Sequence, residues 1–181
     1  MRSVRWLRQL AVLVLLFLLM FVIAEFRTPP ERLTADGAAV QVIDGDSLRV
    51  GARTVRLQGI DAVEYQQPCR ATDGTEWRCG VDARKALAGL VGKGGLVCES
   101  QATDSFGRAV SSCSTNGVED IGAALVAQGW AVSGDGEREG AYTAQQQAAQ
   151  ASKRGIWRGE FDRPAVWRAA HPRSAPSVPA R

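Results

Sequence analysis

The amino-acid sequence predicts an α+β domain, mainly β, in which five short strands form a small barrel accompanied by three helices. The first observation is that short runs of alternating apolar and polar residues are separated by tight turns containing Gly and Asp, which is typical of antiparallel strands. The second is that three longer segments repeat apolar residues at helical spacing. We therefore expect three strands, one helix, two strands and two helices, in that order.

The first three expected strands form a meander. Residues 38–44 alternate in polarity up to the turn DGD, and SLRV at 47–50 resumes the alternation. The tight turn GAR then leads into TVRLQGI at 54–60, where successive side chains face opposite sides of the strand. A polar loop bounded by two cysteines follows this meander.

The remaining elements are helices and one hairpin. Residues 81–91 have helical spacing, and GLVCES (95–100) and RAVSSCS (108–114) flank the turn TDSFG as the strands of a hairpin would. Two further helices are expected over 119–130 and about 139–154. Five strands with a helix between the third and fourth have the layout of an OB-fold, whose open face binds nucleic acids or sugars.

The first 24 residues predict a signal peptide or an N-terminal membrane anchor. Three arginines precede an uncharged apolar run at 10–24. This run has 15 residues, fewer than the roughly 20 that a helix needs to cross a bilayer, which favours a signal peptide cut after Ala24. The alternative is an uncleaved anchor, a single transmembrane helix that binds the membrane through residues 10–24. In both cases residues 25 onward are expected to be extracytoplasmic, either periplasmic or secreted.

Composition divides the rest of the chain into a linker at 25–37, the OB-fold domain at 38–160 and a largely disordered tail at 161–181. The only histidine, His171, lies in this tail, which excludes hydrolases and phosphotransferases that depend on a histidine in the folded part. Beyond residue 24 the chain has 19 basic and 19 acidic residues, which excludes a broad basic surface for nucleic acid. Catalysis would have to rely on carboxylates, arginines and a metal ion.

Four cysteines, Cys69, Cys79, Cys98 and Cys113, lie in the part expected to be exported, so disulfides are the first interpretation. Three connectivities are open, and the local pairs Cys69 with Cys79 and Cys98 with Cys113 need the least chain to close. The second local pair would join neighbouring strands of the expected hairpin. A structural zinc site is disfavoured because the sequence has no Cys-x-x-Cys motif.

Three charged residues lie within nine positions at the end of the third expected strand: Arg56, Asp61 and Glu64. Asp46 lies in the first turn and Arg108 directly follows TDSFG. Carboxylates are suitable ligands for a hard cation, and arginines are suitable donors to phosphate. Each residue alone also has a structural explanation, such as turn composition for Asp46 or a solvated surface position for Glu64.

The chain contains five separated motifs: IDGDSLRV, RLQGIDAVE, TDSFGRA, ALVAQGWA and ASKRGIW. In order and spacing, over about residues 38–158, they resemble the staphylococcal nuclease family of thermonuclease-like proteins. The resemblance implies a calcium ion bound by two carboxylates and one main-chain carbonyl, here Asp46, Asp61 and the carbonyl of Ala62. It also implies two catalytic arginines and a glutamate general base, here Arg56, Arg108 and Glu64.

The function implied by the resemblance is an exported, calcium-dependent nuclease that hydrolyses phosphodiester bonds of DNA and RNA with low sequence specificity and leaves 3′-phosphates. In that function the cation polarises the phosphoryl oxygen, the glutamate activates water and the arginines stabilise the transition state. We expect a monomer whose substrates are DNA and RNA, and we infer no protein partner. The alternative is a non-catalytic extracytoplasmic OB-fold module that binds nucleic acid or polysaccharide.

The sequence departs from the family pattern at several places. Ala62 and Val63 stand where the family has Thr-Pro, so the turn before Glu64 lacks a stiffening proline. Phe106 replaces a tyrosine in the turn before the second catalytic arginine. The segment VSGDGEREG after Trp130 lacks the tyrosines that stack on the base, so we expect low or different base selectivity.

Overall fold

The computed structural model describes residues 2–25, 30–134 and 140–172. The chain divides into two compact units, residues 1–30 and residues 31–181. The first unit is helix α1 (Arg2–Glu25), which contains the apolar run of the expected signal or anchor. Among the helices of the described residues, none is both long enough and apolar enough to pass through a membrane. The export signal stays a prediction.

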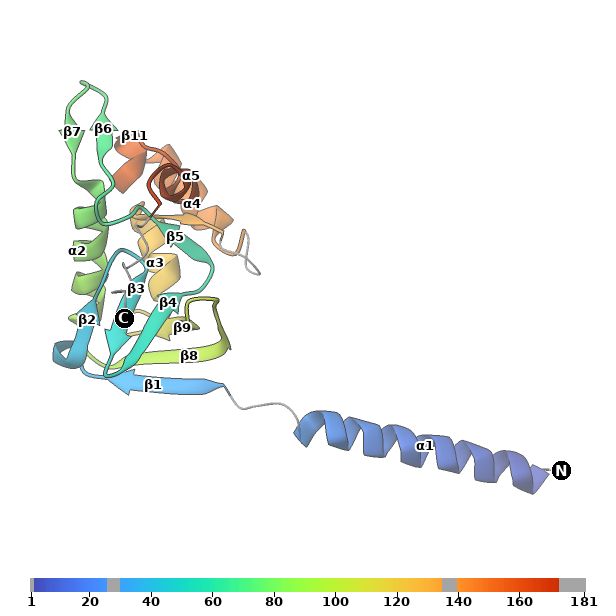
Figure 1. Cartoon of the computed structure of the whole chain (residues 1–181). Helices are drawn as coiled ribbons and strands as arrows, with labels where there is room; N and C mark the ends of the chain where they lie inside the picture. Colours follow the sequence, from blue (N-terminus) through green and yellow to red (C-terminus); the bar gives the residue numbers. More distant parts are fainter. Residues whose placement is uncertain (1, 26–29, 135–139, 173–181) are drawn as a thin grey trace, which may run out of the picture. The chain divides into compact units, whose positions relative to one another are not determined.

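The second unit is built on a curled six-stranded sheet with the order β1-β8-β9-β4-β3-β2 (Figure 1). Neighbouring strands are antiparallel except for β4 and β9, which are parallel. The strands are β1 (Glu31–Ala35), β2 (Val40–Val42), β3 (Ser47–Val50), β4 (Arg53–Leu57), β8 (Leu96–Thr103) and β9 (Ala109–Ser114). This curled half-barrel is consistent with the predicted mainly-β OB-fold, but the described residues contain eleven strands and five α-helices rather than five and three.

The third expected strand is in fact two strands. It breaks after β4 because Gly59 has a positive φ of 78°, a conformation that favours glycine. The chain turns there into β5 (Ile60–Ala62), which leaves the main sheet and pairs with β10 (Ala131–Ser133). This turn returns the chain toward the start of β3 and so positions the candidate site.

Strand β1 lies inside the segment predicted to be a linker, 25–37, and corrects that boundary. It pairs along its whole length with β8, and Leu33 packs against the main core. Arg53 donates to Glu31 through both Nε and Nη2 and so joins β1 to β4. Apolar packing and pairing with β8 hold this segment in a strand, although its alternation of apolar and polar residues covers few positions.

The three helices expected inside the domain are present as α2 (Cys79–Val91), α3 (Ile121–Gln128) and α4 (Thr143–Ala151). Residue 139, where the last was expected to begin, lies outside the described residues. A fifth helix, α5 (Pro164–Ala170), corrects the prediction of a largely disordered tail at 161–181 as far as residue 172, and residues 173–181 lie outside the described part of the chain. Pro164 is buried at its first position, where proline suits a helix start, and α5 lies beside β5 (Figure 1).

A small three-stranded sheet and two disulfides complete the unit. The sheet has the order β11-β6-β7, formed by β6 (Cys69–Ala71), β7 (Glu76–Trp77) and β11 (Gly159–Glu160). The local disulfide pairing is confirmed, with Cys69 bonded to Cys79 and Cys98 to Cys113. The second bond lies in the main core between β8 and β9, whereas the first lies in a smaller core that includes Val63 and Ile156.

Candidate active site

The barrel strands bring three of the predicted site residues into direct contact. Arg56 on β4 donates from Nη1 to Oδ1 of Asp46 at 2.9 Å and from Nη2 to Oδ1 of Asp61 at 3.0 Å. The β3–β4 register pairs Ser47 with Arg56, which places Asp46 at the strand start next to the guanidinium. The turn at Gly59 brings Asp61 back to the same guanidinium. All three charged side chains are at least nine-tenths buried.

Asp46 is held by several donors, yet its charge is incompletely balanced. Its Oδ1 also accepts from the Ser47 hydroxyl at 3.0 Å, and its Oδ2 accepts from the Ala62 N–H at 2.9 Å. Burial raises the pKa of Asp46 to about 7, and the positive charge of Arg56 lowers it only in part. The neighbouring carboxylates of Asp44 and Asp61 act in the same direction as burial, whereas the Ala62 N–H acts with Arg56.

Arg108 reaches the same site from the turn between β8 and β9. Its Nε donates to Oδ2 of Asp104 at 2.7 Å, and its Nη1 lies 3.5 Å from Oγ of Ser47, the same hydroxyl that donates to Asp46. Burial raises the pKa of Asp104, but hydrogen bonds from Arg108 and the Phe106 N–H outweigh it and hold that pKa below its usual range. Phe106 is 82% exposed with its ring 5.4 Å from the guanidinium.

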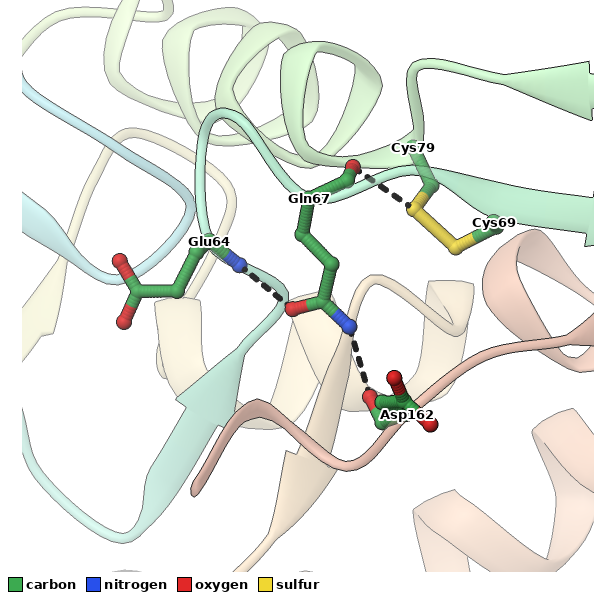
Figure 2. Close-up of a disulfide and its surroundings, with 5 residues drawn as sticks. All are labelled: Glu64, Gln67, Cys69, Cys79 and Asp162. Atoms are coloured by element: carbon green, nitrogen blue, oxygen red, sulfur yellow. Dashed lines mark hydrogen bonds between the residues drawn. A yellow bond between two sulfur atoms is a disulfide. The ribbon is translucent and has the colours of Figure 1, made fainter. Parts of the chain in front are cut away.

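The backbone of Glu64 is fixed by a residue that the sequence did not single out. The Glu64 N–H donates to Oε1 of Gln67 at 3.1 Å, and Nε2 of Gln67 donates to the Asp162 carbonyl at 2.7 Å (Figure 2). Sγ of Cys79 lies 3.3 Å from the Gln67 carbonyl. Figure 2 shows the Glu64 carboxylate directed away from the disulfide.

The turn before Glu64, which lacks the Thr-Pro that the resemblance implies, is formed by buried residues. Ala62 and Val63 are 3% and 0% exposed, and Val63 belongs to the smaller core. Gln67 is 1% exposed and holds the turn from the other side. Burial and the Gln67 side chain thus restrict this turn where the family uses a proline.

Arg168 on α5 is a further site residue that the sequence analysis missed. Its Nη1 and Nη2 donate to Oδ1 and Oδ2 of Asp61 at 2.8 and 3.0 Å, and Nη1 also donates to Oε1 of Glu64 at 3.1 Å. Hydrogen bonding to Asp61 raises the pKa of Arg168 above its usual value, against the effect of burial. The signal that could have indicated it was PAVWRAA, a short helical pattern with proline at its start.

A groove of about 1650 Å³ opens beside Glu64 and Arg168. Its lining includes aromatic side chains, of which Tyr65, Phe106 and Trp167 are examples. It also has more acidic than basic side chains, and the acidic ones are Asp44, Glu64, Glu76, Glu160 and Asp162. A polyanion entering this groove would meet repulsion unless a cation or an arginine offsets it.

His171 follows α5 directly and lines the same groove, so its predicted place in a disordered tail is corrected. Its ring stacks on Trp167 with centroids 4.3 Å apart, and its Nδ1 lies 3.0 Å from the Trp167 carbonyl. His171 therefore belongs to the folded part, and the prediction that the folded part has no histidine is wrong. The polar contact of His171 is with the backbone of its own helix.

The site contains oxygen donors of the type that hard cations bind. Asp46 and Asp61 provide two carboxylates, and the backbone of Ala62 lies next to Asp46. In the described part of the chain, no group of three or more His, Cys, Asp or Glu side chains is arranged to hold a metal ion. A cation bound here would have two carboxylates and a main-chain oxygen as protein ligands, completed by water or phosphate. The raised pKa of Asp46 is consistent with a need for such a cation.

Comparison with known proteins gives two matches. The family model described as "Staphylococcal nuclease homologue" matches residues 54–159, more than half of the chain. The chain is also similar to a protein of Rhizobium meliloti (strain 1021) named "Succinoglycan biosynthesis protein ExoI", with 35% identity over 120 residues. That alignment covers 66% of this chain and 63% of the relative, so the chain spans less than two thirds of the relative's length. The family match contains Arg56, Asp61, Glu64 and Arg108, and it ends before α5.

Proposed function

Since the chain belongs to the family of staphylococcal nuclease homologues, we propose that it is a calcium-dependent nuclease that hydrolyses DNA and RNA with low sequence specificity. The observation that supports this most is the linked set of charges in which Arg56 bridges Asp46 and Asp61 while Arg108 reaches Asp46 through Ser47. Two disulfides indicate an oxidising, extracytoplasmic environment. We propose that residues 1–24 direct export and that the protein acts as a monomer.

The proposed roles follow from the positions of the side chains. Asp46, Asp61 and the Ala62 carbonyl would hold calcium, which supplies positive charge against the charge that develops on the phosphate. Arg56 donates to Asp46 and Arg108 lies within reach of Ser47 beside it, and both guanidinium groups would bind the phosphate oxygens. Glu64, fixed by Gln67 at its backbone, would accept a proton from the attacking water.

The groove suggests how a strand approaches. Phe106 offers an exposed ring beside Arg108, which is a suitable arrangement for stacking a base next to a bound phosphate. The acidic side chains on the groove walls disfavour a long run of phosphates. We therefore propose that short or locally single-stranded segments are preferred to duplexes.

Cleavage assays on the purified full chain test this proposal. Single-stranded DNA and RNA are incubated with calcium or with a chelator, for the native chain, Asp61→Asn and the control Asp82→Asn, a partly exposed residue of α2 paired with Lys85. We expect calcium-dependent cleavage that falls at least ~10²-fold in Asp61→Asn and is unchanged in Asp82→Asn. Cleavage that persists in the chelator would exclude the cation-dependent mechanism.

A second candidate function is the binding of a polysaccharide without cleavage of nucleic acid. Two observations favour it: the groove combines aromatic and acidic side chains, and the R. meliloti relative is named for succinoglycan biosynthesis. OB-fold barrels bind oligosaccharides as well as nucleic acids. Saturable binding of a polysaccharide, with no cleavage of DNA or RNA in calcium, would select this candidate.

A further inference from the structure

We propose that Arg168 is a built-in competitor of the divalent cation, so that α5 closes on the site when no cation is bound and cation binding releases the guanidinium from Asp61. This inference rests on the cation site of the proposed function. It concerns a residue beyond the region of the family match, which ends at residue 159.

Arg168 and a cation would compete for the oxygens of Asp61. Oδ1 accepts hydrogen bonds from both Arg56 and Arg168, and Oδ2 accepts one from Arg168. Each carboxylate oxygen has two lone pairs, so Oδ1 is saturated and Oδ2 is half used. A calcium ion needs a carboxylate oxygen at about 2.3–2.6 Å. Release of the two-pronged guanidinium would make both oxygens available to the cation.

The charges around Asp61 give a second argument. Arg168 and a divalent cation are both positive and would lie against the same Asp61 carboxylate, so each disfavours the binding of the other. The side chains of Asp61 and Glu64 are 9% and 15% exposed, so water and salt screen this repulsion only in part.

Of the two arginines, Arg168 is the one that can leave. Its side chain is 39% exposed, whereas that of Arg56 is 10% exposed on a strand paired on both sides. Arg168 is carried by a helix of seven residues. The segment before this helix is anchored by the Gln67 bond to the Asp162 carbonyl, so α5 can move away while its base stays attached.

Calcium titration by calorimetry on the full chain tests the proposal directly. We expect Arg168→Gln to bind calcium about tenfold more tightly than the native chain, since one competing charge pair is lost. Arg168→Lys keeps the charge but lacks the fork of donors, and its affinity should lie between the two. The control is Arg163→Gln, which removes the same charge from an exposed position just before α5 and should bind calcium as the native chain does.

Hydrogen exchange gives a readout that does not depend on affinity or activity. Calcium should increase backbone exchange over residues 164–170 of the native chain and leave that of α2 unchanged. Calcium affinity that is unchanged or weaker in Arg168→Gln would overturn the proposal, as would exchange in α5 that does not respond to calcium.

The two proposals fail in different ways. Tighter calcium binding by Arg168→Gln without any cleavage of nucleic acid would support the exchange and reject the nuclease. Calcium-dependent cleavage with an unaltered affinity in Arg168→Gln would reject only the exchange. Calcium binding by neither chain would overturn the exchange together with the cation site.

Discussion

The barrel strands β3–β5 and the C-terminal segment from β11 to α5 both supply charged groups to one site, but they hold them differently. Arg56 and Asp61 lie on paired strands, Asp46 directly precedes β3, and all three are almost fully buried. Arg168 comes from a short helix, is partly exposed, and bonds to Asp61 and Glu64. The difference suggests that the barrel fixes the chemistry while the C-terminal segment controls access to it.

The largest contrast is expected between the two arginines. Arg56→Gln leaves Asp46 and Asp61 buried without their shared partner, so we expect a loss of about 3–5 kcal/mol in the free energy of unfolding. Cleavage should fall ~10²-fold to 10³-fold. Arg168→Gln should change the unfolding free energy by only about 1 kcal/mol or less because its side chain is partly exposed. Urea unfolding and cleavage rates measure the effects of both substitutions. Equal losses of stability and activity in the two variants would contradict the proposal that the two arginines have different roles.

The two disulfides provide a matched pair for the same comparison. Each closes a short loop, with sequence separations of 10 and 15, so replacing either pair of cysteines by serine should cost about 3 kcal/mol in unfolding free energy. Only the Cys69–Cys79 pair lies next to Gln67. At a temperature where both variants are folded, we expect cleavage to fall in Cys69→Ser/Cys79→Ser and not in Cys98→Ser/Cys113→Ser. Equal activities would show that this disulfide does not help to position Glu64.

Gln67→Leu tests the connection between the two regions at a single side chain. It leaves the Glu64 N–H and the Asp162 carbonyl without their partner, which should cost about 1–3 kcal/mol. We also expect a lower turnover number with little change in KM, because Glu64 loses its anchor. Gln147→Leu, on the exposed face of α4, is the control. Steady-state kinetics and urea unfolding measure both effects, and a variant with unaltered turnover would show that Gln67 does not position Glu64.

Much of the barrel side was predictable because its interactions are local in sequence. The alternation around Leu48 and Val55 indicated β3 and β4, and adjacent strands had to bring Asp46 close to Arg56. The separated motifs indicated Arg108 in the correct turn. The sequence pattern did not indicate the strand break, because Gly59 continues the alternation of the expected strand. Its positive φ ends β4.

The C-terminal side was not predictable because distant partners determine it. Helix α5 has seven residues, too few to be stable from its own sequence, and it is ordered by contacts such as those of Arg168 with Asp61, 107 positions away. Nothing in the pattern around Gln67 indicated that its side chain joins Glu64 to Asp162. The same long-range ordering placed His171 in the groove rather than in a disordered tail.

The smallest expected effect is a pH dependence that belongs to the barrel side. Burial raises the pKa of Asp46 from 3.8 to about 7, so between these values the folded chain holds a proton that the unfolded chain has lost. In chelator, the unfolding free energy should therefore fall as pH rises from 5.5 to 7 and level off above, by about 1–2 kcal/mol. Asp46→Asn should lack this component. Urea unfolding at several pH values measures it, and identical pH profiles would show that Asp46 does not titrate there.

The most direct test of the proposed nuclease is the cleavage rate of single-stranded DNA in calcium for Glu64→Gln beside Glu119→Gln, an exposed glutamate outside the groove. The account predicts that Glu64→Gln loses at least ~10²-fold in rate at saturating calcium, and that Glu119→Gln cleaves as the native chain does. A Glu64→Gln chain that cleaves at the native rate would contradict the account, because no proton acceptor would then be needed at the position that Gln67 and the barrel hold in place.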